Sequence, residues 1–176
     1  MRPIASPAEL SRRLAGAGRV AVLGVGSDLR GDDIAGCQVA RRIGARLARI
    51  DLRPGLTVAV FHGGTAPENC TGAIKRFQPT HLVIVDAAHL ERETGAVALI
   101  DPAHAPGVSI STHRLPMHVL LDYLGAFLTF ETIVIGIQPG DLTYHRPPSP
   151  AVARAGAAVV SALVAAFVAH DRRQRP

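Results

Sequence analysis

Three aspartates follow the first strongly apolar stretch of the chain. The segment VLGVGSDLRGDDIAG, which starts at Val22, places Asp28, Asp32 and Asp33 within six residues. Glycines followed by acids suggest either a turn that binds phosphate or a set of oxygen ligands for a cation. A dinucleotide-binding turn requires GxGxxG, and here Leu29 occupies the third glycine position. Carboxylates would also repel a pyrophosphate, so the pattern favours a cation site.

Further polar side chains follow the other predicted strands. Asp86 ends the strand in LVIVDAA, and His113 lies in STH after the next strand. Open α/β sheets bind ligands outside the carboxyl ends of their strands, so we expect an aspartate of the first group, Asp86 and His113 to converge there. Two carboxylates and one imidazole suit Ni, Zn, Mn or Fe(II), and three protein ligands leave positions open for something else.

Each of these side chains also has a structural interpretation. Asp86 can cap a turn, and Asp33 can be an acid favoured by the dipole at a helix N-terminus. Asp32 is well placed to be the N-cap of that helix. His113 can be a hydrogen-bonded, partly buried histidine, and Cys37 falls on the apolar face of its helix, as a core residue would. The hypothesis of a site therefore depends on the coincidence of three residues, not on any one.

Apolar periodicity predicts strands and helices in alternation along one domain, residues 1–176. Strands are expected at residues 19–25, 56–61, 82–85, 97–100 and 132–137. Helices are expected at residues 7–15, 33–50, 67–77 and 116–124, and after Ser149-Pro150. This order predicts an α/β three-layer sandwich with a twisted, mostly parallel five-stranded sheet flanked by helices. The segment 88–112 lacks a helical pattern and can hold an antiparallel pairing.

Composition narrows the class of protein. The net charge of +5 comes almost wholly from arginine, without a basic stripe interleaved with aromatics, so no nucleic-acid partner is expected. Cys37 and Cys70 have no CxxC partner, which excludes a thiolate zinc site and fits the reducing cytoplasm. Residues 155–169 are uncharged but shorter than the roughly 20 residues that span a bilayer, so we expect a buried helix and no membrane insertion.

Five motifs occur in a fixed order: GVGSDLRGDDIAG, GGTAPENCTG, LVIVDAA, STHRLP and GIQP. This set, from about Val20 to Pro139, resembles the hydrogenase maturation endopeptidases, in particular the branch that serves hydrogenase 3-type enzymes. The resemblance implies an α/β endopeptidase. Its expected partner is the nickel-loaded precursor of a nickel–iron hydrogenase large subunit, from which it would remove the C-terminal extension.

The resemblance also implies roles for particular residues. It makes Asp33, the second acid of the pair, a metal ligand and catalytic residue together with Asp86 and His113. Nickel is expected to arrive on the substrate, and Zn or Cd to be able to replace it in the isolated protein. We expect the backbone of Gly63, Gly64 and Thr65 to hold the tail of the precursor, and Gln138 to bond its backbone. A role in turns only is the alternative for these four.

Two residues depart from the family pattern. Ser27 stands where Asn is usual, and Ile34 stands where Gly or Ala is usual. Neither removes a ligand, although Ile34 places a bulky side chain near the expected cleft and can alter which precursor fits. Whether an aspartate or the metal activates the water stays open at this point.

Two other classes of protein share parts of this pattern. A phosphoacceptor receiver domain also has acids after its first and third strands. It needs a lysine after the fifth, where this chain has Gln138. A non-catalytic nickel-binding or chaperone-like protein of the same fold would bind a precursor without cutting it.

Overall fold

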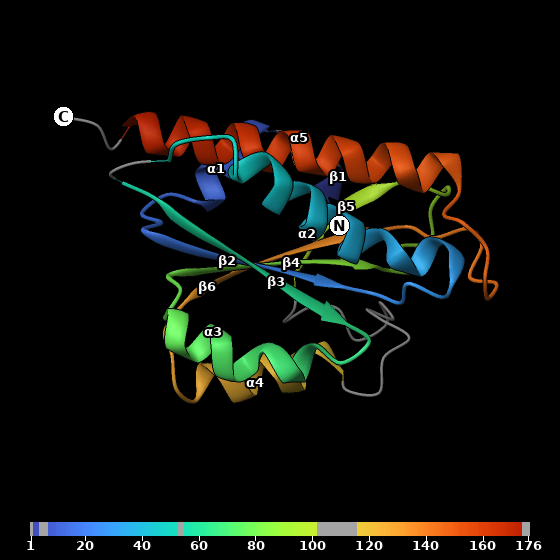
Figure 1. Cartoon of the computed structure of the whole chain (residues 1–176), viewed down its shortest axis with the longest axis horizontal. Helices are drawn as coiled ribbons and strands as arrows, with labels where there is room; N and C mark the ends of the chain where they lie inside the picture. The colour runs from blue at the N-terminus through green and yellow to red at the C-terminus, as the bar shows by residue number, and fades with distance from the viewer. Residues whose placement is uncertain (1, 4–6, 53–54, 102–115, 174–176) are drawn as a thin grey trace.

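A computed structural model describes residues 2–3, 7–52, 55–101 and 116–173. These residues form a three-layer α/β domain in which helices cover both faces of one sheet (Figure 1). The predicted fold class is therefore confirmed. The six strands are ordered β1-β5-β6-β4-β2-β3 across the sheet.

Four strands run parallel and form the centre and one edge of the sheet: β2 (Arg19–Val25), β3 (Thr57–Gly64), β4 (His81–Ala87) and β6 (Glu131–Ile137). Every residue of β4 is buried, as are all but the first of β2, which explains their nearly continuous apolar sequences. The fourth predicted strand, β5 (Val97–Ile100), pairs antiparallel with β6. A sixth strand, β1 (Arg2–Pro3), extends the sheet beside β5 and was not predicted, because two residues carry no period.

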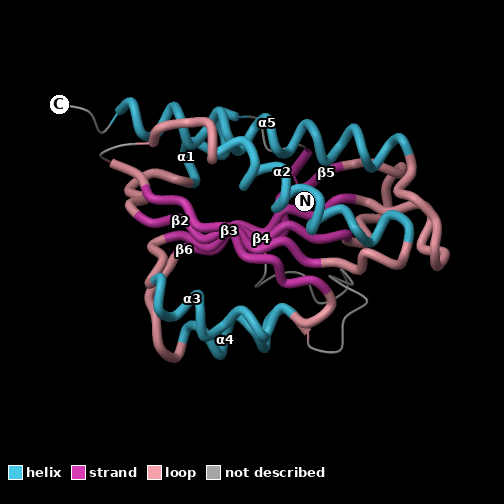
Figure 2. Tube along the Cα trace, in the orientation of Figure 1, coloured by secondary structure: helices cyan, strands magenta, loops and turns pink. Residues whose placement is uncertain are grey.

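The helices divide between the two faces of the sheet (Figure 2). One face carries α1 (Pro7–Arg13), α2 (Ala35–Leu47) and α5 (Pro150–Arg173), and the other carries α3 (Thr71–Phe77) and α4 (Met117–Gly125). Short 3-10 turns precede two of them, η1 (Gly31–Ile34) before α2 and η2 (Pro67–Cys70) before α3. The helix predicted from Asp33 thus begins as a 3-10 turn, which holds both acids of the pair.

Helix α5 packs along the sheet as a core helix. Its residues Pro150–Asp171 are long and apolar enough to cross a membrane by length and composition, yet half of the most apolar window is buried inside the domain. Leu163 and Phe167 are fully buried among residues of β2, β4 and β6. Ser149 caps the helix, since its hydroxyl accepts the backbone N–H of Val152 at 3.4 Å. The prediction of a buried helix is therefore confirmed.

Gly36, in the first turn of α2, lets the helix approach the sheet. A Cβ at this position would collide with the carbonyl oxygens of Val25, the last residue of β2, and of Val85 in β4. We expect Gly36→Ala to lower the free energy of unfolding by about 3 kcal/mol, measured by urea unfolding, because two rigid backbones would have to separate. Gly44→Ala, in the same helix, meets nothing within 4 Å and should stabilise the protein by up to about 1 kcal/mol. Equal losses in both variants would contradict this account.

Candidate functional site

The structure brings Asp33 and Asp86 together at the carboxyl end of the sheet. Asp86 is the penultimate residue of β4 and is 0% exposed, while Asp33 lies in η1 and is 1% exposed. Burial raises the pKa of Asp86 well above its ordinary value, and the negative charge of Asp33 raises it further, against a smaller lowering by the backbone N–H of Ala87. The structure thus places a buried carboxyl group, whose ionised form is disfavoured, beside a second buried carboxyl group at the carboxyl end of the sheet.

The loop after β2 is folded tightly around Asp33. The backbone N–H of Ser27 donates to Asp33 Oδ2 at 3.0 Å. Gly26 has a φ of +140°, and a Cβ there would collide with the carbonyl oxygen of Asp33. Ser27 therefore serves the site through its amide, while its hydroxyl accepts the N–H of Leu29 at 3.2 Å. The departure from Asn at position 27 leaves the contact with Asp33 in place.

Cys37 packs against the loop after β2 and bonds it. It is 3% exposed, and its thiol donates to the carbonyl oxygen of Gly26 at 3.3 Å. Burial, with a smaller contribution from Asp28, raises the pKa of the thiol to about 11. A thiol that stays protonated at neutral pH is a poor nucleophile and a poor metal ligand, so the predicted core role of Cys37 is confirmed.

Asp32 lies beside Asp33 but has a different role. Its carboxylate accepts the backbone N–H groups of Gly140 at 2.8 Å, Asp141 at 2.9 Å and Ser149, and the Ser149 hydroxyl at 3.1 Å. The Asp32 N–H donates in return to the carbonyl oxygen of Asp141 at 2.8 Å. Its interpretation as an N-cap is therefore wrong, because Arg30 occupies that position without a side-chain cap. Asp32 instead anchors the loop between β6 and α5.

Gln138 is placed at the same end of the sheet, as predicted, but its amide is directed into the protein. The residue is 5% exposed, its Oε1 accepts the N–H of Leu90 at 2.6 Å, and its Nε2 donates to the carbonyl oxygen of Pro139 at 2.9 Å. These bonds organise the turn after β4. They support the structural alternative for Gln138 and give no support to the prediction that it bonds substrate.

Gly63 and Gly64 end β3 next to the aspartate loop. The carbonyl oxygen of Gly64 accepts the N–H of Gly26 at 3.0 Å, and Gly64 has a φ of +56°. Gly63 is buried, and a Cβ there would lie 3.0 Å from the carbonyl oxygen of Gly24. Both glycines thus hold β3 close to the loop after β2. Thr65, the third residue of this predicted group, is exposed and is the one most open to a bound chain.

His113, the third predicted ligand, lies outside the residues that the structure describes. Among those described, no three His, Cys, Asp or Glu side chains are arranged to hold a metal ion. The placement of His113 by topology requires a parallel fourth strand, but β5 pairs antiparallel with β6, Val97 with Ile137 and Ile100 with Val134, so its carboxyl end points away from Asp86. The antiparallel pairing that the sequence allows within residues 88–112 is the one observed. The place of His113 at the site thus depends on the resemblance alone.

Two exposed side chains, Leu29 and Tyr144, were not predicted from the sequence, and we call this pair the rim. Leu29 and Tyr144 are 56% and 61% exposed, and they lie on two loops joined by a backbone bridge between Arg30 and Tyr144. The Arg30 guanidinium lies 5.4 Å from the centre of the Tyr144 ring. Leu29 stands within the first motif, between the two groups of aspartates, and that position was the signal in the sequence that could have identified this rim.

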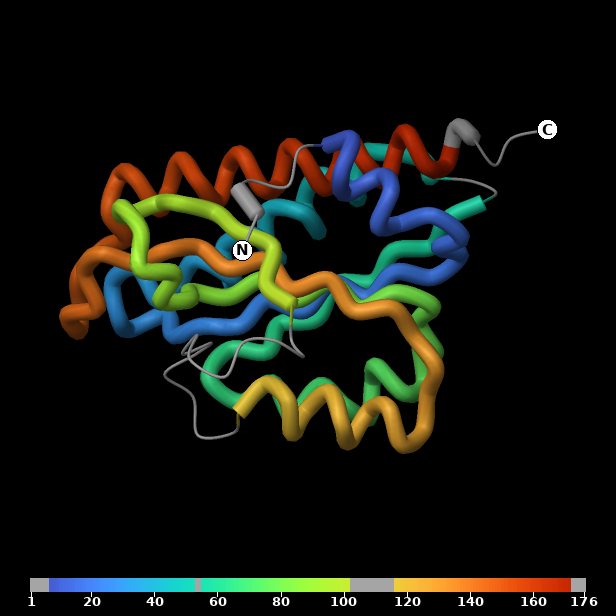
Figure 3. Tube along the Cα trace, turned by 180° about the vertical axis from the view of Figure 1, so that it is seen from behind, coloured from blue at the N-terminus to red at the C-terminus, as the bar shows by residue number. Residues whose placement is uncertain are grey.

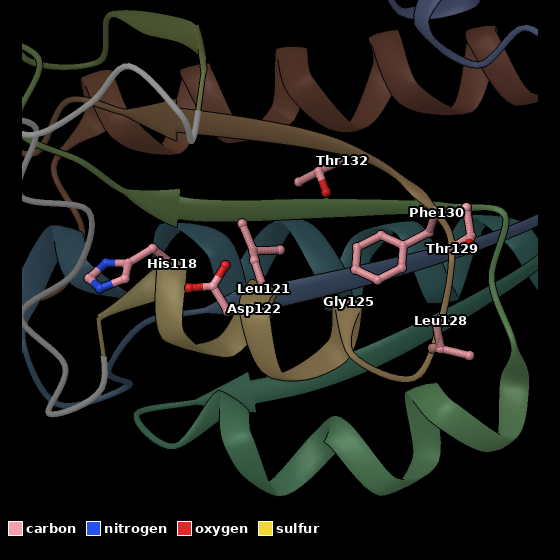
Figure 4. A pocket seen from close by; sticks show the side chains of 8 residues that line it. All are labelled: His118, Leu121, Asp122, Gly125, Leu128, Thr129, Phe130 and Thr132. Carbon is pink, nitrogen blue, oxygen red and sulfur yellow. The ribbon is translucent and has the colours of Figure 1, made fainter.

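A separate pocket of about 650 Å³ lies along α4 and the start of β6 (Figure 4). Its lining is His118, Leu121, Asp122, Gly125, Leu128, Thr129, Phe130 and Thr132. Neither Asp33 nor Asp86 lines it, and the titratable groups among its described lining residues are His118 and Asp122. The pocket is therefore distinct from the carboxylate pair.

Comparison with known proteins identifies the family of the chain. A family model described as HycI, hydrogenase maturation protease, matches residues 38–166, a range that includes Asp86 and begins just after Asp33. The hydrogenase 3 maturation protease of Escherichia coli K12 is 35% identical over 127 residues, which cover 72% of this chain and 76% of that protein.

Solved structures give the same result. The crystal structure of the NiFe hydrogenase maturation protease HycI from Thermococcus kodakarensis has a TM-score of 0.78 and 30% identity, and the match covers 91% of this chain and 98% of that one. The hydrogenase maturating endopeptidase HybD of Escherichia coli has a TM-score of 0.68 and 25% identity, with 86% and 93% covered. The chain belongs to the hydrogenase maturation protease family.

Proposed function

We propose that this protein is the endopeptidase that removes the C-terminal extension from the nickel-loaded precursor of a nickel–iron hydrogenase large subunit. The observation that carries the proposal is the buried Asp86 beside Asp33 at the carboxyl end of the sheet, in a chain of this family. The protein would act in the cytoplasm, where its two cysteines, both free of disulfides, would stay reduced.

In the proposal, the carboxylate pair lets the protein distinguish a nickel-loaded precursor from one without nickel. The raised pKa of Asp86 means that its carboxyl tends to keep its proton while no cation is near. A nickel ion carried by the precursor offsets the repulsion from Asp33, so Asp86 would lose its proton as the precursor docks. A precursor without nickel supplies no such charge and would leave the pair unengaged.

In the proposal, Asp33, Asp86 and His113 contact the nickel of the precursor and so position the peptide bond beside it. Holding the bond in place in this way supplies most of the orientation that hydrolysis needs. Two routes fit the activation of water: a carboxylate of the pair takes its proton, as in aspartic peptidases, or the nickel lowers its pKa. In both routes, loss of either aspartate removes the docking of the metal.

The experiment that tests the function is mass spectrometry of a nickel-loaded large-subunit precursor from the same organism, before and after incubation with this protein. We expect a mass loss equal to the C-terminal extension, and no loss for the same precursor prepared without nickel. A precursor that forms a complex with the protein and keeps its full mass would support the non-catalytic, chaperone-like alternative and contradict the proposal.

A further inference from the structure

The outer surface of α2 and α5 carries a row of arginines over an apolar floor. The two helices lie side by side on one face of the sheet (Figures 1 and 3). Arg42, Arg46 and Arg49 line a cavity of about 370 Å³ between them, together with Ala45, Ala157 and Val160. All three arginines are exposed. We call this set of six residues the arginine groove.

Positive charges predominate on the two helices that form the groove, and Asp51, two residues after Arg49, is the nearest acid that follows the row in the sequence. Residues 35–50 contain four arginines and no acid, and residues 150–170 contain Arg154 and no acid. Arg41 is already paired with Asp28. Within the described part of the chain, the three arginines of the groove take part in no salt bridge. The groove is therefore a cationic surface whose three arginines have no carboxylate partner among the residues that the structure describes.

The shape of the groove indicates an extended anionic ligand. From Arg42 to Arg49 the row extends roughly 10 Å along the axis of α2. One phosphate group is too small to contact guanidinium groups spread over that length. The lining contains no aromatic side chain on which bases could stack, so a single-stranded nucleic acid is disfavoured. An acidic peptide segment with some apolar side chains fits both the arginines and the floor formed by Ala45, Ala157 and Val160.

The position of the groove relates it to the carboxylate pair. Helix α2 follows η1, which holds Asp33, and Arg42 lies two turns into the helix. The row therefore starts about two helical turns beyond Asp33 and leads away from it along α2. A folded partner whose tail occupied the site would have its body within reach of this surface.

We propose that the arginine groove is a second docking surface, which binds an acidic segment of the large-subunit precursor outside its cleaved tail. This inference rests on the proposed function for the identity of the partner. Such a surface would act on encounter and binding more than on the chemical step, because charge complementarity mainly sets the association rate and specificity.

The test measures cleavage of the nickel-loaded precursor by a double charge-reversal variant, Arg42→Glu with Arg46→Glu. We expect KM to rise roughly tenfold with little change in kcat, and the salt dependence of kcat/KM to become weaker. The charge-retaining variant Arg42→Lys with Arg46→Lys should keep KM within about threefold of the wild type. Arg76→Glu, an exposed arginine of α3 on the opposite face, is the matched control and should leave both constants unchanged.

Failure of this inference can be told apart from failure of the proposed function. If the wild type cuts the precursor and the double reversal has the same KM, the groove is no docking surface and the function stands. If the wild type does not cut, binding of the labelled precursor is measured directly by fluorescence anisotropy. Equal affinity of the wild type and the double reversal in that assay would overturn the inference by itself.

Discussion

Asp86→Asn is expected to abolish processing of the nickel-loaded precursor and, at pH 7.5, to raise the Tm of the isolated protein. Processing should fall by about 10²–10⁴-fold, because an amide can neither carry the negative charge that holds a cation nor take a proton from water. Stability should rise because burial and the charge of Asp33 both disfavour an ionised carboxyl at this position. The wild-type protein would thus be less stable than Asp86→Asn because its function requires a carboxyl group at this buried position.

The pH dependence of the gain in stability follows from the direction of the pKa shift. The pKa of Asp86 is raised in the folded state, whereas in the unfolded chain it is about 3.9. Below that value the carboxyl is protonated in both states, and its ionisation costs the fold nothing. As the pH rises toward the folded-state pKa, the unfolded state loses its proton first and the wild type loses stability. Asn does not titrate, so its advantage should grow with pH.

Thermal unfolding of the wild type and Asp86→Asn between pH 4.5 and pH 7.5 measures this difference. Each kcal/mol gained should raise Tm by about 2–4 °C in a domain of this size. Asp122→Asn, on the exposed surface of α4, is the control and should change Tm little at either pH. A difference between wild type and Asp86→Asn that was the same at both pH values would contradict the assigned cause.

The elements with strong patterns were predictable from sequence. Residues 19–25 were assigned as a strand with the bounds that β2 has, because a strand buried on both faces is apolar throughout. The direction of β5 was not predictable, since four apolar residues read the same in either orientation. That ambiguity explains why the placement of His113 by topology fails, because the carboxyl end of an antiparallel strand lies at the opposite end of the sheet from the carboxyl ends of the parallel strands.

The site was predictable in its residue types and less so in their roles. Membership of the family removes the receiver-domain alternative, which the missing lysine after β6 already disfavoured. The roles of Asp32 and Gln138 depend on backbone groups far away in the chain, such as Gly140, 108 residues after Asp32. No local pattern reports such a contact, so the sequence could not show that both side chains are directed into the protein.

Asp32 and Asp33 are neighbours for which we expect opposite effects on substitution. Asp32→Ala would leave the N–H groups of Gly140, Asp141 and Ser149 without their charged acceptor, in hydrogen bonds that are partly buried. A hydrogen bond to a charged group contributes about 1.5–3 kcal/mol, so loss of the three should lower the free energy of unfolding by about 3 kcal/mol or more. Asp33→Asn should change it by less than about 1 kcal/mol, because the amide oxygen can still accept the N–H of Ser27.

In processing activity the order of the two variants should be reversed: Asp33→Asn should be the more damaging change. Asp33→Asn should process nickel-loaded precursor about 10²–10⁴-fold more slowly, because one of the two charges that hold the cation is lost. Asp32→Ala, assayed well below its lowered Tm, should keep measurable processing, since its carboxylate faces the loop between β6 and α5. Urea unfolding and the mass-spectrometric assay give the two readouts. A stable, inactive Asp32→Ala with an active Asp33→Asn would mean that the first acid of the pair is the ligand, because only the carboxylate that meets the nickel of the precursor is indispensable to cleavage.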